Sequence, residues 1–143
     1  MTAPIKTAFA DWVNKADVRE ILNIPVDVKA WEVCSDIEYQ ADVNATIWLY
    51  PYLNELYRIL IYSGTTDGAV PTRGTKQWIS ETGFVITEEW RPYFFNGQLA
   101  GHLERREKDF TFATVHGTGH MAPQWKRGET YHMIFGWLFN RTI

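Results

Sequence analysis

The sequence predicts an α/β fold: a mixed, mostly parallel sheet with flanking helices and a C-terminal amphipathic helix. Three observations lead to this class. Residues 58–62 form a continuous run, rich in β-branched and aromatic residues, that reads as a buried strand, a helix opened by proline follows it, and a set of further strands precedes the last helix. With 143 residues, 45% of them hydrophobic, the chain can bury a core, and residues 1–143 are treated as a single unit.

Two helices are expected before the buried strand. Asn14 and Asp17 have the spacing of a capping box, and the apolar residues after them recur at helical intervals until Pro25. Residues 43–57 carry a second helical pattern, in which Pro51 is tolerated in the first turn.

The run at 58–62 is rich in β-branched and aromatic residues and ends at Ser63-Gly64, which predicts a central strand covered on both faces. After a loop over residues 65–70, Pro71 is expected to open a helix that reaches Ile79. The chain is therefore expected to form a strand, loop and helix unit here.

The remaining elements are a strand meander and one helix. The meander is expected over residues 84–95, 98–105 and 110–116, with turns at Asn96-Gly97 and Lys108-Asp109. A C-terminal helix follows, with an apolar stripe expected to face the sheet. The stripe consists of Tyr131, Ile134, Phe135 and Leu138.

Composition excludes several classes of function. The formal net charge is −3, and no basic cluster is longer than Arg105-Arg106, so we expect no nucleic-acid partner. No apolar run is long enough to cross a bilayer, so we expect no membrane association, and the first residues lack the apolar region of a signal peptide.

The chain has one cysteine, Cys34, which is either an ordinary thiol of a reducing compartment or one half of a bridge to another chain. Asn44 and Asn140 each begin a triplet of the N-glycosylation type. These features together favour an oxidising compartment.

Two titratable residues stand where open α/β sheets place reactive groups, in loops that follow strands: Asp67 and His120. Taken alone, Asp67 before glycine is a common turn residue, and His120 is an ordinary loop histidine. Together they stand in the order of the triad acid and base of α/β-hydrolases. A metal site at His116 and His120 is disfavoured, because the glycines between them break the helix that would align two imidazoles. No metal or other cofactor is expected.

The sequence around these residues resembles the serine carboxypeptidase family over most of the chain. Residues 59–71, ILIYSGTTDGAVP, are similar to the family's strand and acid loop, and residues 114–123, TVHGTGHMAP, to its histidine loop. The resemblance implies that Asp67 is the triad acid and His120 the catalytic histidine. Met121, next to His120, either lines the leaving-group pocket or is an ordinary core methionine. It also implies that the chain is the C-terminal part of an α/β-hydrolase, which removes C-terminal amino acids from peptides.

The chain departs from the family pattern at several points. It has Thr65 where the family usually has an aspartate and Tyr93 where a second tryptophan is usual. None of its three serines, at positions 35, 63 and 80, lies in a Gly-x-Ser-x-Gly elbow. The nucleophile is therefore expected on another segment, and this chain alone is expected to be inactive.

Some members of the family consist of two disulfide-linked chains, and this sequence resembles the second. The resemblance implies that Cys34 pairs with a cysteine of the N-terminal, serine-bearing chain, and that the protein is secreted, lysosomal or vacuolar. Two alternatives remain: a non-catalytic structural or binding module derived from the same fold, and an acyltransferase or lyase on the same scaffold. The presence of both Asp67 and His120 favours the enzyme over the module.

Overall fold

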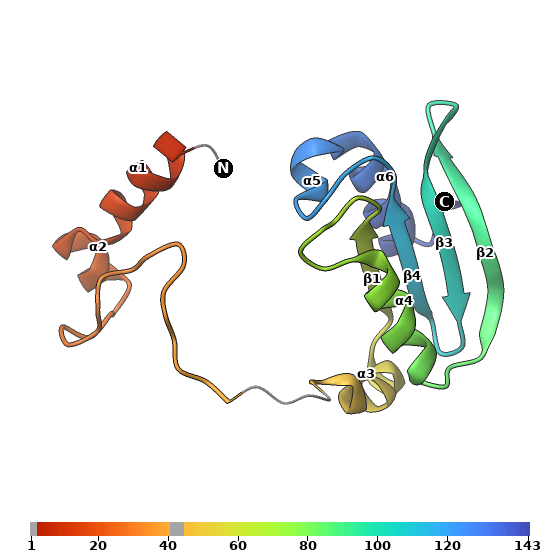
Figure 1. The fold of residues 1–143 in the computed structure, drawn as a ribbon, viewed down its shortest axis with the longest axis horizontal. Coiled ribbons are helices and arrows are strands. Elements are labelled where there is room, and N and C mark those ends of the chain that lie inside the picture. Colours follow the sequence, from red (N-terminus) through yellow and green to blue (C-terminus); the bar gives the residue numbers. More distant parts are fainter. Residues whose placement is uncertain (1–2, 41–44) are drawn as a thin grey trace. The chain divides into compact units, whose positions relative to one another are not determined.

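A computed structural model describes residues 3–40 and 45–143 of the chain. It divides the chain into two compact units, Met1–Ala41 and Asp42–Ile143, which are described separately (Figure 1). The second unit contains the sheet and both loops that the sequence singles out.

The first unit holds two helices, α1 (Ala3–Val13) and α2 (Ala16–Ile21). The predicted helix before Pro25 is α2, whereas α1 was not predicted. The capping box at Asn14 was wrong, because Lys15 is the N-cap residue of α2. The Asn14 amide instead bonds the backbone of Trp31 in both directions: Nδ2 donates to its carbonyl oxygen at 2.8 Å, and Oδ1 accepts from its amide nitrogen at 2.7 Å.

The second unit is built on a four-stranded mixed sheet with the order β1-β4-β3-β2. Only β1 and β4 run parallel, and the β4–β3 and β3–β2 pairs are antiparallel. The expectation of a mostly parallel sheet was therefore wrong for this chain, since the meander supplies antiparallel neighbours. The strands are β1 (Ile59–Gly64), β2 (Ile86–Phe95), β3 (Gln98–Arg106) and β4 (Phe110–Val115).

Strand β1 lies at the edge of this sheet and not at its centre. Among the described residues it pairs only with β4, and its residues 59–61 are half-buried while Tyr62 is exposed. The prediction of a central strand covered on both faces is therefore not met within this chain. One row of backbone groups along β1 faces away from the sheet.

The meander has the predicted turns. Asn96 and Gly97 have φ values of 50° and 76°, and Lys108 and Asp109 have 56° and 59°. Two successive positive φ angles give the turn whose twist matches a two-residue hairpin. These turns fix the antiparallel register that brings β4 back beside β1.

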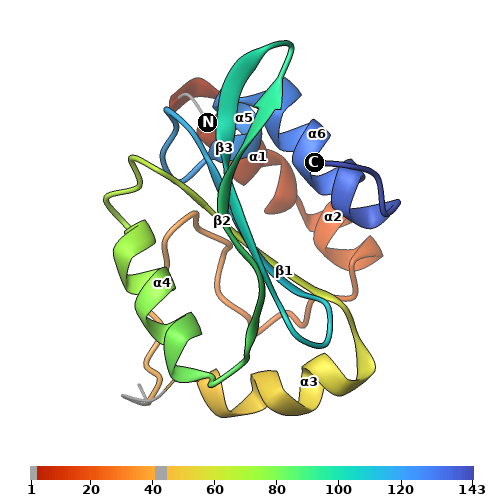
Figure 2. The same cartoon turned by 90° about the vertical axis from the view of Figure 1, so that its right-hand side faces the viewer.

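Helices cover both faces of the sheet. Met133, Ile134 and Trp137 of α6 pack on one face, and Trp78 and Ile79 of α4 pack on the other; Figure 2 shows these two helices on opposite sides. The helices after the first unit are η1 (Ile47–Leu49), α3 (Tyr50–Leu56), α4 (Thr72–Glu81), α5 (Ala122–Trp125) and α6 (Arg127–Leu138).

Most of the helix predictions are confirmed in position. Pro51 lies in the first turn of α3, and Pro71 is the N-cap residue of α4, where a missing N–H costs least. Of the predicted apolar stripe of the C-terminal helix, only Ile134 packs against the core, whereas Tyr131, Phe135 and Leu138 are exposed.

Small and flexible side chains occupy the buried side of α6 instead: Thr130, Met133 and Gly136. Gly136 has a packing reason, since a Cβ there would lie 2.7 Å from Cγ1 of Ile143. The close approach to Ile143 therefore selects a face that apolar periodicity alone does not identify.

Candidate active site

The two loops of interest leave neighbouring parallel strands at the same edge of the sheet. Gly64 of β1 and Val115 of β4 are the last paired residues, so the loops beginning at 65 and 116 start side by side. The carboxyl edge of parallel strands is where open α/β sheets place ligands and reactive groups. The crossover of the chain thus brings together two segments that are far apart in sequence.

Hydrogen bonds join the two loops. The Thr65 amide donates to the carbonyl oxygen of Val115, and the Thr66 amide to that of Thr118, each at 3.0 Å. The Gly117 amide donates to Thr65 Oγ1, also at 3.0 Å. The loops therefore form one hydrogen-bonded structure continuous with the β1–β4 ladder.

Gly64 allows this close approach. A Cβ at this position would overlap the carbonyl oxygens of Thr118 and Gly119, and it would lie 2.9 Å from the carbonyl carbon of Gly119. Only a residue without a side chain lets the histidine loop lie directly against the end of β1.

Asp67 and His120 contact each other across the two loops. His120 Nδ1 lies 3.0 Å from Asp67 Oδ2. An ionised carboxylate can only accept a hydrogen bond, so the proton of this bond is on Nδ1 and Nε2 is left as the free acceptor. The Asp67 side chain is 7% exposed and that of His120 is 60% exposed, so the pair has a buried acid and an accessible base.

The second carboxylate oxygen of Asp67 is held by its own loop. Oδ1 accepts hydrogen bonds from the amides of Ala69 at 2.8 Å and Val70 at 3.0 Å. Asp67 is therefore both the turn residue that its sequence context suggests and the partner of the histidine.

The hydrogen bond from the backbone amide of Val70, with those from His120 and Ala69, lowers the pKa of the Asp67 carboxyl from its usual value. This effect outweighs the burial of the carboxyl, which acts in the opposite direction. The carboxylate is therefore ionised at neutral pH and can stabilise a positive charge on the adjacent imidazole.

A hollow of about 330 Å³ lies beside the pair. It lies between β1, α4 and the two loops, and aromatic and small polar side chains form its wall. These include Tyr50, Ser63, Val70, Thr75, Trp78 and His120. The only serine in this wall, Ser63, donates its hydroxyl proton to Thr75 Oγ1 at 3.4 Å, so it is engaged with the wall itself.

The other sequence-predicted residues are placed as follows. Met121 is 46% exposed and follows His120 as the N-cap residue of α5. Cys34 is exposed in the first unit as a free thiol. Asn140 is exposed, and its Oδ1 accepts a hydrogen bond from Arg58. Asn44 lies outside the described residues.

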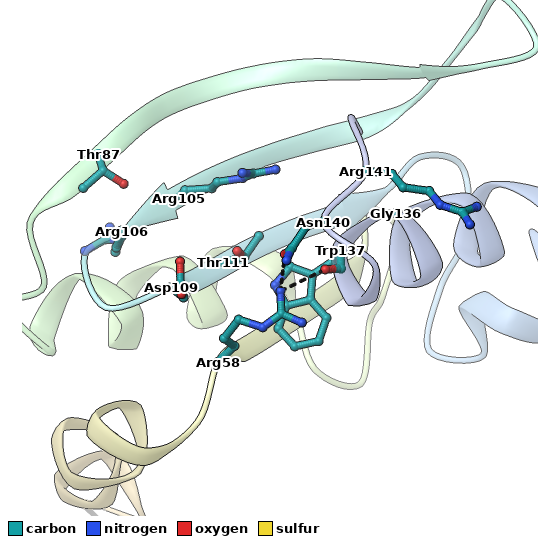
Figure 3. Close-up of a pocket in the computed structure, with 10 residues that line it drawn as sticks. All are labelled: Arg58, Thr87, Arg105, Arg106, Asp109, Thr111, Gly136, Trp137, Asn140 and Arg141. Carbon is teal, nitrogen blue, oxygen red and sulfur yellow. Dashed lines mark hydrogen bonds between the residues drawn. The ribbon is translucent and has the colours of Figure 1, made fainter.

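A second hollow, of about 270 Å³, lies near the opposite end of the sheet and contains four arginines, at positions 58, 105, 106 and 141 (Figure 3). Arg58 donates to the carbonyl oxygens of Trp137 and Leu138 at the end of α6. Arg105 and Arg106 are paired with Glu88 and Glu104. Because these three guanidinium groups are engaged, we interpret this hollow as a structural support of α6.

Sequence reasoning missed two residues that build the site, Thr65 and Thr72. Thr65 Oγ1 accepts from Gly117, and Thr72 Oγ1 donates to the carbonyl oxygen of Gly64 at 3.1 Å. Both are short polar residues in or next to a loop, where threonine is too common to be a signal. Contacts of this kind become visible only when both loops are placed.

No cluster of three or more histidine, cysteine, aspartate or glutamate side chains in residues 3–40 and 45–143 has the arrangement of a metal site. None of the helices in these ranges combines the length and apolar character that crossing a membrane requires.

Comparison with known proteins finds one family. A family model described as "Serine carboxypeptidase" matches residues 2–140. The chain is 37% identical over 135 residues to serine carboxypeptidase-like 17 of Arabidopsis thaliana, covering 92% of this chain and 31% of that protein. It is 32% identical over 131 residues to serine carboxypeptidase 1 of Hordeum vulgare, covering 89% of this chain and 26% of that protein.

A shorter relative is covered more fully. The putative serine carboxypeptidase-like 52 of Arabidopsis thaliana is 36% identical over 136 residues, which cover 92% of this chain and 73% of that protein. The chain thus spans less than a third of the first relatives that it matches and most of this one.

Proposed function

The chain belongs to the serine carboxypeptidase family, and we propose that it supplies the acid and the base of a catalytic triad whose serine lies on an N-terminal segment. The observation that carries the proposal is the contact between His120 Nδ1 and Asp67 Oδ2, with the rest of the imidazole exposed. The substrates are peptides, from which the complete enzyme removes C-terminal amino acids.

In the proposed mechanism, Nε2 of His120 takes the proton of the serine hydroxyl as the oxygen attacks the scissile carbonyl. Asp67 accepts the hydrogen bond from Nδ1 and stabilises the imidazolium that forms. His120 then gives this proton to the departing amino group, which leaves an acyl-enzyme. Water, deprotonated by His120, releases the shortened peptide, and Met121 lines the leaving-group pocket beside the base.

Two features support a complementing segment. Strand β1 has one row of backbone groups with no strand beside it among the described residues, and the hollow next to Asp67 and His120 adjoins that edge. Unpaired edges are ready sites for a further strand. The serine-bearing segment would pair there and bring its hydroxyl to Nε2.

The covalent link and the compartment belong to the same proposal. Cys34 is exposed and available to form a disulfide with the serine-bearing chain, which requires an oxidising compartment. We therefore propose a secreted, lysosomal or vacuolar location. Glycosylation at Asn44 and Asn140 remains a prediction.

The test begins with native material, separated by electrophoresis under non-reducing and reducing conditions. We expect reduction to release a companion chain whose peptides, identified by mass spectrometry, include a Gly-x-Ser-x-Gly sequence. A single band of unchanged mobility, in material that hydrolyses peptides, would contradict the two-segment proposal.

Activity is then measured on a blocked dipeptide, with the chain alone and with its companion. We expect turnover only from the complex, together with loss of turnover in His120→Gln. Transfer of the acyl group to water, with release of the C-terminal residue, identifies a hydrolase. Transfer of the acyl group to an added alcohol without hydrolysis would replace this proposal by an acyltransferase. Labelling of the isolated chain by a serine-directed fluorophosphonate would show that a nucleophile is present after all.

A further inference from the structure

Besides the contact between Asp67 and His120, the side chain of Thr65 joins the loop that presents His120 to the acid loop. Three hydrogen bonds cross between the loops near the end of the strands. Two are made by the amides of Thr65 and Thr66 to carbonyl oxygens, so any residue except proline could form them. The third, from the Gly117 amide to Thr65 Oγ1, requires a hydroxyl at position 65.

Gly117 is where the histidine loop changes direction. Its φ is +70°, in the region that favours glycine. This conformation takes the chain out of the β4 ladder two residues after Val115, and the amide of Gly117 turns to Thr65 Oγ1. The loop then runs through Thr118 and Gly119 to His120, and a Cβ added at Gly119 would lie 3.6 Å from the carbonyl oxygen of Thr66 and 3.9 Å from Cα of Asp67.

We propose that Thr65 is a positioning residue for the base: its hydroxyl fixes the first turn of the histidine loop and so holds His120 Nδ1 on Asp67. The proposal rests on the function proposed above for Asp67 and His120. Thr65 acts through Gly117, and no hydrogen bond joins it to the imidazole. Its effect must therefore pass along Gly117, Thr118 and Gly119 to His120.

The sequence offers a matched control in the same loop. Thr118 is 4% exposed, and its Oγ1 is buried without a hydrogen-bond partner among the described residues. Thr65→Val and Thr118→Val make the same chemical change, but only the first removes a hydrogen bond. Thr65→Ser keeps the hydroxyl and removes only a methyl group.

The experiment uses NMR of the complete 143-residue chain and needs neither serine nor substrate. We expect Thr65→Val to make the Gly117 amide exchange about 5-fold faster, as the loss of one ordinary hydrogen bond predicts. The ring-nitrogen shifts of His120 should move from the Nδ1–H tautomer towards a mixture of both. Thr65→Ser and Thr118→Val should resemble the wild-type chain in both measurements.

Two results would overturn the proposal. One is an unchanged His120 tautomer in Thr65→Val while the Gly117 amide is released. The other is loss of the tautomer in Thr65→Ser, which would assign the effect to the methyl group. If Thr65→Val does not fold, the Thr65→Ser result still decides between hydroxyl and methyl.

In the complemented enzyme, Thr65→Val should lower kcat about 10-fold and leave KM unchanged, because only the alignment of the base is altered. Thr65→Ser should restore kcat. If the complex lacks activity altogether while the NMR results hold, the proposed function fails and the positioning role of Thr65 stands.

Discussion

The contact between the end of β1 and the histidine loop can be tested by adding one methyl group, in Gly64→Ala. The new carbon would lie 2.9 Å from the carbonyl carbon of Gly119, whereas carbon atoms pack at roughly 3.5–4.0 Å. The loop must therefore retreat by about 0.6–1.1 Å. The atoms that the new Cβ would meet are backbone atoms of Thr118 and Gly119 and not the end of a flexible side chain. Backbone hydrogen bonds also hold both loops in place there.

A retreat of this size ends the contact between His120 and Asp67, since their 3.0 Å bond would lengthen beyond the range of a hydrogen bond. Overpacking of this kind costs about 1–3 kcal/mol of unfolding free energy, and a misplacement near 1 Å costs on the order of 100-fold in rate. We expect Gly64→Ala to lower the urea midpoint accordingly and to remove the Nδ1–H tautomer of His120.

Gly74→Ala is the matched control. Gly74 lies inside α4, and no atom lies within 4 Å of its added Cβ, so alanine there should raise the unfolding free energy by about 0.5–1 kcal/mol. If Gly64→Ala has wild-type stability and keeps the His120 tautomer, the close packing argued for this edge of the sheet is refuted.

Three further predictions concern groups around the sheet. Asp67→Asn should reduce turnover of the complemented enzyme about 10⁴-fold, measured as kcat, because the amide favours the wrong tautomer of His120. The folded-state pKa of Asp67 is lowered, so the contribution of its carboxylate to stability is present above the unfolded pKa and lost as pH falls through the folded pKa. Acid titration followed by circular dichroism should therefore show a smaller loss of stability in Asp67→Asn than in the wild-type chain. Arg58→Met should lower the unfolding free energy by about 1 kcal/mol, because the guanidinium bonds the last carbonyls of α6. Arg73→Met, at an exposed position of α4, should change it little, and equal effects would contradict the capping role. Tyr93→Phe should cost about 1–2 kcal/mol in urea unfolding, since its buried hydroxyl donates to the Thr114 carbonyl oxygen at 2.9 Å, and an unchanged midpoint would contradict this.

Sequence reasoning predicted the second unit well where local chemistry determines the structure. The Asn96-Gly97 turn and the prolines at the starts of α3 and α4 have conformational preferences that act within a few residues. The same locality explains the failure at Asn14, whose side chain bonds Trp31, 17 residues away, and not the start of α2.

The larger errors came from choices that depend on neighbours. An apolar run such as residues 59–61 predicts a strand that is covered, but what covers it can lie outside the chain, and β1 is at an edge here. On α6, periodicity selected Tyr131 and Phe135, while Met133 lies in the core cluster and Gly136 is buried against Ile143. Apolar patterns identify surfaces that need partners and do not say which partner each receives.

For the candidate site, the sequence indicated both loops and both residues, and the structure brings Asp67 and His120 into contact. Thr65 and Gly64 were not identified as its supports, because their contribution is a contact between loops whose separation in sequence is about 50 residues. Contacts between these loops depend on the pairing of β1 with β4, which local sequence patterns do not specify.

That parallel pairing has a consequence for folding kinetics. The hairpins of the meander close over a few residues, whereas β1 must find β4 across a long crossover, and such non-local steps are slow. Asp67 and His120, 53 residues apart, come together only when this last strand docks. We therefore expect the antiparallel strands to pair before β1 docks on β4, and the contact between Asp67 and His120 to form with that slower step.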